Sequence, residues 1–414
     1  MIFFRTISTP EPSIQDAHIR HDSPVAKFSV SAFSLFGDLS DDEESTSVVA
    51  PSTPPRRFNY KPTDTSGVLK TPDRGEVTCR DFFTPPRIST GITEQLNFSK
   101  IVQSSAGAQV LLFSNKLNPR SGIACKSGGS VLEETRLLSN IKPSPFITSA
   151  TPFHLLSSES VYKIKAAFDS ESSSNVTLLP DSIVMPRARG DLNQFKSQFA
   201  SFFDDPQVPS DRKQFAFWSL LAMMSEAIFE VNSSKYIHRD IKPANFLLFE
   251  RMTISLTDFG EASPKKKAHD DLGFTPDYAP PEFYRLEVKD RLGIEDFSMN
   301  YSSDIWSLGA SVHDIVFGYP YYKTSGDESS ASPDQWFRSA SSMAELRRQL
   351  LGRTDQRSDI KEGLDFILQG ALHEQPNERI KLHDICSRCA DELIRFDATT
   401  INSVKEIING FTLP

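Results

Sequence analysis

Apolar residues recur with two different spacings along the 414-residue chain. Runs of strand length come first: 100–114, 121–127 and 182–186. Runs of helical length and spacing include 131–141 and, further along the chain, 211–231, 303–318, 342–352 and 362–372. Strands followed by helices predict an α+β fold with two lobes, a small N-lobe that carries a sheet and a larger helical C-lobe.

Residues 1–94 differ from the rest because they are rich in Ser, Thr, Pro and Asp and show no sustained helical or strand period. Such a segment buries too little apolar surface to offset the entropy lost on ordering. We therefore predict a disordered regulatory tail over 1–94 and a folded domain over 95–396, followed by a C-terminal extension over 397–414. Within the folded domain the N-lobe is expected over 95–186 and the C-lobe over 187–396.

The net charge of −9 argues against nucleic acid as a partner, since phosphate backbones are bound by clustered positive charge. The N-terminal apolar run is only three residues long, and no run approaches the roughly 18 residues that cross a bilayer. We expect no signal peptide and no membrane attachment, and a monomer of the cytoplasm or nucleus. Cys386 and Cys389 are interpreted as residues of a late helix rather than as a metal site.

Four polar residues lie close together in YIHRDIKPANFLLF and SLTDFG. Phosphoryl transfer needs a carboxylate for the incoming hydroxyl, a cation for the phosphate and oxygen ligands for a metal ion. Asp240 can accept the hydroxyl proton, and Lys242 can neutralise the phosphate. Asn245 and Asp258 supply oxygen ligands for Mg²⁺. The order and spacing of these residues predict a phosphoryl-transfer site.

HRDIKPAN and DFG resemble the catalytic and metal-binding motifs of eukaryotic protein kinases. FTPDYAPPE at 274–282 is similar to their substrate-seating segment. In SSDIWSLGA the resemblance implies that Asp304 braces the catalytic loop, and in PNER that Arg379 pairs with Glu282. Lys242 together with Thr275 is similar to the Ser/Thr-specific branch.

The resemblance implies an ATP site between the lobes. IACK resembles the strand that carries the phosphate lysine, which would be Lys126 paired with Glu134; Lys116 is the alternative, at a more usual interval from that glutamate. In VMPRARGDL, Val184 would lie behind the adenine. The remaining implied contacts are Val110, Ala124, the backbone of Met185 and Arg187, and the side chains of Asp191 and Leu247.

The chain departs from the family in its glycine-rich loop. Gln103, Ser105 and Ala108 stand at the glycine positions, and Gly107 is offset by one. Glycine lets a backbone approach phosphates closely, so the grip on ATP is expected to be weaker or different.

Two further hypotheses concern regulation. The first is that Asp270 or Asp271 supplies a permanent anion for Arg239; the alternative is that both are solvated acids beside KKK. The second rests on Thr53, Thr71 and Thr84, each followed by proline and then by arginine two residues later. This spacing resembles sites of an upstream proline-directed kinase, although TP pairs are common in such tails.

The sequence thus predicts an ATP- and Mg²⁺-dependent Ser/Thr protein kinase that acts on protein substrates. One alternative is a pseudokinase-like scaffold, and another is a kinase that acts mainly on its own tail. MPRA and APPE resemble rhoptry kinases of coccidian parasites, and KPANFL with APPE resembles spindle-checkpoint kinases, so the subfamily stays open.

Overall fold

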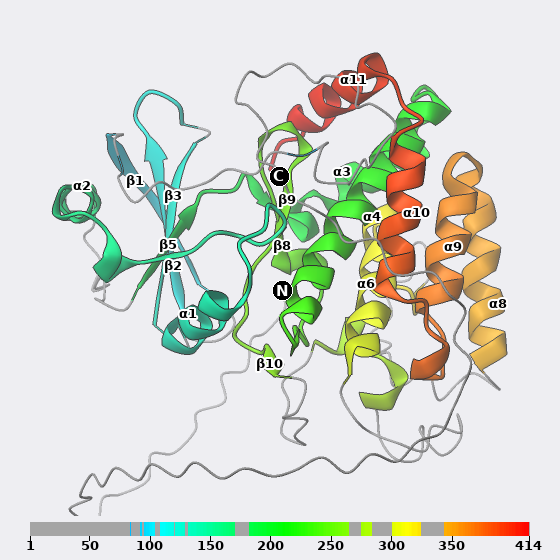
Figure 1. Cartoon of the computed structure of the whole chain (residues 1–414). Helices are drawn as coiled ribbons and strands as arrows, with labels where there is room; N and C mark the ends of the chain where they lie inside the picture. The colour runs from blue at the N-terminus through cyan, green and yellow to red at the C-terminus, as the bar shows by residue number, and fades with distance from the viewer. Residues whose placement is uncertain are drawn as a thin grey trace, which may run out of the picture. The chain divides into compact units, whose positions relative to one another are not determined.

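The computed structural model of the protein describes residues 83, 92, 95–103, 108–119, 121–128, 131–169, 182–264, 275–283, 300–323 and 343–413. By its contacts the chain divides after Gly67, and every described residue belongs to the second unit, Val68–Pro414. Figure 1 shows a sheet with two helices on one side of this unit and a mostly helical part on the other. The predicted α+β fold with two lobes is confirmed.

The N-lobe is built on an antiparallel five-stranded sheet in the order β1-β2-β3-β5-β4. Its strands are β1 (Leu96–Gln103), β2 (Gln109–Asn115), β3 (Gly122–Ser127), β4 (Thr151–Pro152) and β5 (Ile183–Pro186). The predicted helix is α1 (Val131–Asn140), and a second helix, α2 (Ser158–Asp169), was not predicted.

One face of this sheet packs in the N-lobe core, and the other faces the C-lobe. Leu111, Phe113 and Cys125 alternate onto one face, where they form a small core that includes residues of α2. The intervening residues of β3, Ala124 and Lys126, lie on the opposite face because successive strand side chains point to opposite sides. This second face is the one from which Lys126 reaches a residue of the C-lobe.

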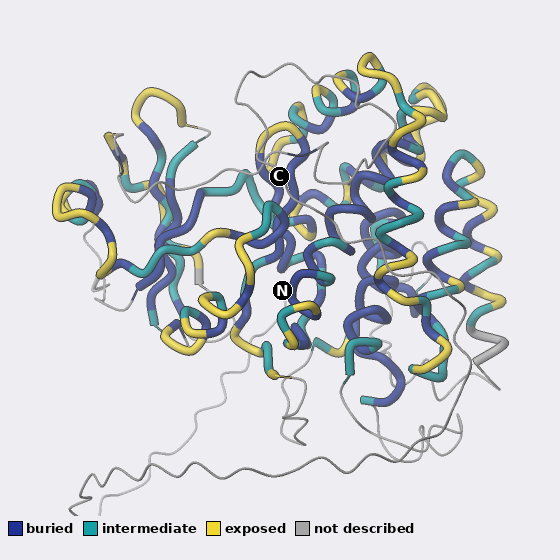
Figure 2. The backbone as a smooth tube through the Cα atoms, viewed as in Figure 1, coloured by how far each residue is buried: buried dark blue, intermediate teal, exposed yellow. Residues whose placement is uncertain are grey.

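The C-lobe surrounds α4 (Ser210–Ser233), which is buried along most of its length and corresponds to the predicted core helix (Figure 2). The other helices are α3 (Leu192–Asp204), α6 (Tyr301–Phe317), α8 (Met343–Thr354), α9 (Lys361–Ala371), α10 (Leu382–Leu393) and α11 (Ala398–Asn409). Cys389 of α10 belongs to the apolar core, in keeping with its interpretation as a helix residue. No helix in the described ranges is both long and apolar enough to cross a membrane.

Two short sheets carry the polar residues of interest. One has the order β6-β8-β9 and consists of β6 (Gly190–Asp191), β8 (Phe246–Leu248) and β9 (Ile254–Leu256). The other pairs β7 (Tyr236–Ile237) with β10 (Ser263–Pro264). The segment after α1 is tied to the first of these sheets, because Leu256 donates its N–H to the Phe146 carbonyl at 2.8 Å.

Both predicted flanking segments contribute to the folded unit. From the range 1–94, Phe83 is buried against Phe146, with the rings at 6.5 Å, and Ile92 packs in the N-lobe core. From 397–414, α11 buries Ile401, Val404 and Ile408 in the C-lobe core. Their spacing of three and four residues is the apolar stripe of an amphipathic helix.

Candidate active site

Lys126 joins the two lobes. It is only 7% exposed, and its Nζ lies 2.7 Å from Oε2 of Glu134 in α1 and 2.7 Å from Oδ1 of Asp258 after β9. Lys116, the alternative from the sequence, is an exposed residue beyond the end of β2. The structure therefore brings Lys126, and not Lys116, to the predicted glutamate.

The charge of Lys126 is maintained by its partners. Burial on its own lowers the pKa of the Lys126 ammonium, but the nearby charges of Glu134 and Asp258 and the hydrogen bonds to them raise it above its ordinary value. The side chain therefore stays protonated at neutral pH, which is the state that can bind a phosphate oxygen.

Asp240 lies at the centre of a second polar group. Its Oδ2 is 2.7 Å from Nζ of Lys242, and its Oδ1 accepts the Thr275 hydroxyl at 2.7 Å. Lys242 also donates to the Thr275 hydroxyl at 2.9 Å. Asn245 donates its Nδ2 to the carbonyl and to Oδ2 of Asp240, at 2.7 and 2.9 Å. Lys242 and Asn245 of the predicted catalytic loop, together with Thr275, therefore converge on the Asp240 carboxylate.

Asp240 is held as a carboxylate. Burial would raise its pKa, but the hydrogen bond and charge of Lys242, together with the Thr275 hydroxyl, bring the pKa below its ordinary value. At neutral pH the side chain is thus ionised and acts as an acceptor of hydrogen bonds.

The backbone before Asp240 is held in an unusual conformation. Arg239 has a φ of 72°, in the left-handed region that costs energy for a residue with a side chain. Asp304 of α6 compensates, because its carboxylate accepts the N–H groups of His238 and Arg239, both at 2.9 Å. The predicted bracing role of Asp304 is confirmed.

Asp258 is also positioned by its neighbours. It has a φ of 62°, and the next residue, Phe259, is buried edge-on against the His238 ring at 4.9 Å between centroids. The Phe259 N–H donates to Oε1 of Glu134 at 3.2 Å. Glu134 therefore bonds both to Lys126 and to the backbone beside Asp258, which links α1 to the C-lobe.

Strand register decides which residues face this site. Val110 lies opposite Lys126, and Met185 lies opposite Ala124, so these four share the face of the sheet that contains Lys126. Val184 pairs with Cys125 and belongs to the core on the other face. The expectation that Val184 lies behind the adenine is wrong, since a shift of one residue along a strand reverses the side-chain direction.

A second expectation, about the linker between the lobes (residues 187–191), is also wrong. The Arg187 N–H was expected to face the adenine, but it donates to the Gly122 carbonyl at 3.0 Å. Asp191 and Leu247 pair across β6 and β8, so their side chains share one face. Leu247 is only partly buried, unlike Phe246 and Leu248 on either side of it, so it points away from the C-lobe core. The Asp191 carboxylate also caps α3 by accepting the Gln194 N–H at 2.9 Å.

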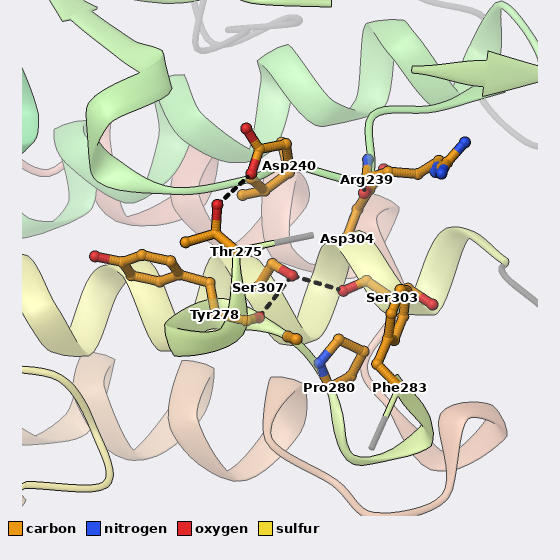
Figure 3. Close-up of a pocket in the computed structure, with 11 residues that line it drawn as sticks. Arg239, Asp240, Thr275, Tyr278, Pro280, Phe283, Ser303, Asp304 and Ser307 are labelled. Atoms are coloured by element: carbon orange, nitrogen blue, oxygen red, sulfur yellow. Dashed lines mark hydrogen bonds between the residues drawn. The ribbon is translucent and has the colours of Figure 1, made fainter. Parts of the chain in front are cut away.

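The segment at 275–283 lies against the catalytic loop. A small pocket there is lined by residues of both, among them Asp240, Thr275 and Tyr278 (Figure 3). Glu282, two residues beyond Pro280, pairs with Arg379 through both of its oxygens, at 2.6 and 2.7 Å. The predicted Glu282–Arg379 pair is confirmed.

Several predictions concern residues outside the described ranges. They are Ser105 and Gly107 of the glycine-rich loop, Asp270 and Asp271 of the activation loop, and Thr53, Thr71 and Thr84 of the tail. Ala108 is described and is buried before β2.

Sequence reasoning gave no role to His238. Its ring is fully buried, its Nδ1 accepts the Asp240 N–H at 3.4 Å, and its Nε2 lies 3.3 Å from the Thr257 carbonyl. It thus connects the backbone beside Asp240 with the backbone beside Asp258. The one signal in the sequence is its position two residues before Asp240.

A family model and several known proteins match this part of the chain. The protein kinase domain family model matches residues 116–389, more than half of the chain. Citron Rho-interacting kinase of Mus musculus is 32% identical over 170 residues, which cover 40% of this chain and 7% of that protein. Serine/threonine-protein kinase 36 of Pongo abelii is 29% identical over 147 residues, or 34% and 10% of the two chains. An Aurora kinase of Yarrowia lipolytica is 34% identical over 110 residues, or 26% and 27%.

The chain spans about a quarter or less of the length of these relatives. A chain of a CAK complex from Chaetomium thermophilum, solved with ATP-γ-S, aligns with a TM-score of 0.46 and 16% identity over 73% of this chain and 92% of its own. The matched domain contains Lys126, Asp240, Asn245 and Asp258, and the named relatives include serine/threonine kinases. The chain therefore belongs to the eukaryotic protein kinase superfamily.

Proposed function

We propose that the chain is an active serine/threonine protein kinase that transfers the γ-phosphate of ATP to protein hydroxyls. The observation that carries the proposal is the Lys126 cluster, in which one ammonium lies 2.7 Å from a carboxylate of each lobe. Such a bridge holds the phosphate lysine and the metal-binding aspartate of the two lobes in one place, as transfer requires.

The remaining residues divide the chemistry among them. Asp240, ionised and facing the substrate segment through Thr275, orients the acceptor hydroxyl and receives its proton. Lys242 lies next to this carboxylate and steadies the phosphate that is transferred. Since no atom of Asp240 forms a covalent intermediate in this scheme, its contribution is positioning and proton transfer.

Asn245 and Asp258 have the donor set that suits Mg²⁺, which prefers hard oxygen ligands. Nδ2 of Asn245 is used by Asp240, so its Oδ1 would be the ligand atom, and Asp258 has a second oxygen beyond the one that bonds Lys126. When bound, Mg²⁺ would neutralise charge on the triphosphate.

The nucleotide contacts proposed for the N-lobe are Lys126, Val110, Ala124 and the side chain of Met185, with Asp191 and Leu247 on the C-lobe side. In the linker, the Arg187 N–H is used by Gly122. We therefore assign the adenine contacts to the neighbouring backbone groups, the Pro186 carbonyl and the Ala188 N–H, because backbone groups alternate in direction along an extended chain.

A scaffold that binds partners without transferring phosphate is the second candidate. The observation in its favour is that the family match begins at Lys116 and leaves out β1, β2 and the segment between them, where the glycine pattern departs from the family. The catalytic set argues against it, since a scaffold has no chemical use for Asp240, Lys242 and Asp258 arranged in this way.

The test is transfer of labelled phosphate from ATP–Mg²⁺ to the chain itself and to a generic Ser/Thr protein substrate. Asp240→Asn should lower the rate by about 10²–10⁴-fold, because it removes the proton acceptor. Asp391→Asn, at an exposed position of α10, makes the same chemical change away from the site and should leave the rate unchanged. A folded wild-type chain that transfers nothing to either substrate would favour the scaffold.

A further inference from the structure

The linker between the lobes is bonded to the C-terminal segment of the chain. Arg189, two residues before Asp191, directs its guanidinium to the end of α11. Its Nη1 donates to the Ile408 carbonyl at 3.0 Å, and its Nη2 donates to those of Asn409 and Phe411, at 3.2 and 2.5 Å. The last carbonyls of a helix have no partner within the helix, and a cation there is favoured by the helix dipole. The Arg189 side chain thus caps the C-terminal end of α11.

The residues after α11 extend this contact to Gly190 and to α3, which follows the linker. Gln198 of α3 bonds both backbone groups of Thr412, accepting its N–H at 2.9 Å and donating to its carbonyl at 2.5 Å. Phe411 stacks edge-on against Phe199 at 5.1 Å. A Cβ placed on Gly190 would lie 2.9 Å from Cδ2 of Leu413 and 2.5 Å from Oε1 of Gln194. Segment 410–413 is therefore packed against α3 and, through Leu413, lies beside Gly190.

Helix α11 also contacts the turn that joins β8 to β9. Oδ1 of Asn409 accepts the Arg251 N–H at 2.7 Å in the turn that joins β8 to β9. Arg251 and the next residue, Met252, have φ values of 56° and 60°, a costly conformation for two residues with side chains. A hydrogen bond from the C-terminal helix helps to keep this turn in place.

We propose that residues 398–413 are a positioning element of the nucleotide site and that Arg189 is the residue through which they act. Arg189 and Asn409 hold the linker and the β8–β9 turn. Asp191 and Leu247, two of the proposed nucleotide contacts, pair in the adjoining strands β6 and β8, two residues after Arg189 and four residues before Arg251. The element lies beyond residue 389, where the family match ends, so it is a feature of this chain in addition to the shared domain.

The proposal separates binding from chemistry. Asp240 is braced from α6 by Asp304 and from the substrate segment by Thr275, and neither contact involves the C-terminal segment. Loosening the linker should therefore weaken nucleotide binding and leave the transfer step almost intact. This expectation rests on the proposed function, because it assumes that ATP binds between the lobes.

The test is Arg189→Gln, with Arg395→Gln as a matched control at an exposed position of the C-lobe. The Kd of ATP–Mg²⁺ by calorimetry and the KM for ATP should rise about tenfold with Arg189→Gln, which removes the guanidinium that bonds three carbonyls at the end of α11, while kcat stays within about twofold. Amide exchange should become faster in 187–191 and in 408–413. Arg395→Gln should change none of these, since exposed ion pairs contribute little.

A second variant guards against general unfolding. Asn409→Ala removes only the acceptor of the Arg251 N–H and should raise the Kd by about threefold with an unchanged melting temperature. Equal affinity and unchanged exchange in Arg189→Gln would overturn the proposal, and so would a fall in kcat at constant KM. A wild-type chain that binds no nucleotide would defeat the proposed function, and the exchange measurement would still decide whether Arg189 holds the linker.

Discussion

Two buried ion pairs in this molecule use the same chemistry in opposite ways. Arg379 and Glu282 are 0% and 1% exposed, and Arg379 uses all three of its nitrogens, bonding also to the carbonyls of Ser302 and His373. The side chains of Lys126 and Glu134 are 9% and 1% exposed, but the side chain of their third partner, Asp258, is 27% exposed. The first pair is closed on every side, whereas the second opens toward solvent at the residue proposed to bind metal.

The difference indicates separate roles. In the described part of the chain Arg379 uses four of its five N–H donors on Glu282 and two backbone carbonyls, so it fixes segment 275–283 to the rest of the C-lobe. An ammonium has three donors, and in the described part of the chain Lys126 uses two of them on carboxylates. The third donor can reach a phosphate, so the cluster can be structural and functional at once.

The largest expected effect comes from breaking the closed pair. Arg379→Ala leaves the Glu282 carboxylate buried without a cationic partner and should lower the free energy of unfolding by about 3–5 kcal/mol. Urea unfolding of the purified chain measures it. The double variant Arg379→Met, Glu282→Leu should recover a large part of the loss, because no charge is then left buried; a double variant as unstable as Arg379→Ala would contradict this role.

The open cluster should respond in activity rather than in stability. Lys126→Arg keeps the positive charge near both carboxylates but replaces a compact ammonium by a wide planar fork. The kcat/KM for ATP should fall by about 10²–10³-fold, as when a positioned transition-state donor is lost. The melting temperature should change by only a few degrees. A large loss of stability with retained activity would reverse the comparison.

A smaller effect is expected at acid pH, where His313 in the C-lobe makes the free energy of unfolding depend on pH. Burial and the nearby charge of Arg353 lower the pKa of its imidazole to about 3. Because the unfolded value is about 6.5, the unfolded state binds a proton between these pH values that the folded state does not. Stability is therefore full above pH 6.5 and should fall by about 2 kcal/mol from pH 7 to pH 5 on account of this group.

Urea unfolding at the two pH values checks this prediction. His313→Gln, which cannot titrate, should lose about 2 kcal/mol less than the wild type over the same interval. An identical pH dependence in both proteins would show that the acid-sensitive group lies elsewhere. Lys126 should stay protonated in this range, since its pKa is raised from a value that is already alkaline.

Sequence alone determined the parts of the site whose geometry is set locally. Asp240, Lys242 and Asn245 lie within six residues of one another, so a single tight loop brings them together. The two-lobed architecture followed from the order of strands and helices, and the Lys126–Glu134 and Glu282–Arg379 pairs followed from motifs that resemble those of a known family.

Only the tertiary structure showed which way the side chains of β5 and the linker point and which residues the two flanking segments contact. Which face Val184 or Met185 presents depends on the register of β5 against β3, and a shift of one residue reverses every side chain. Arg189 meets carbonyls about 220 residues away, and Phe83 meets Phe146 across another long interval. Such contacts are chosen by complementary shape and by unpaired helix-end carbonyls, which leave no fixed spacing in a sequence.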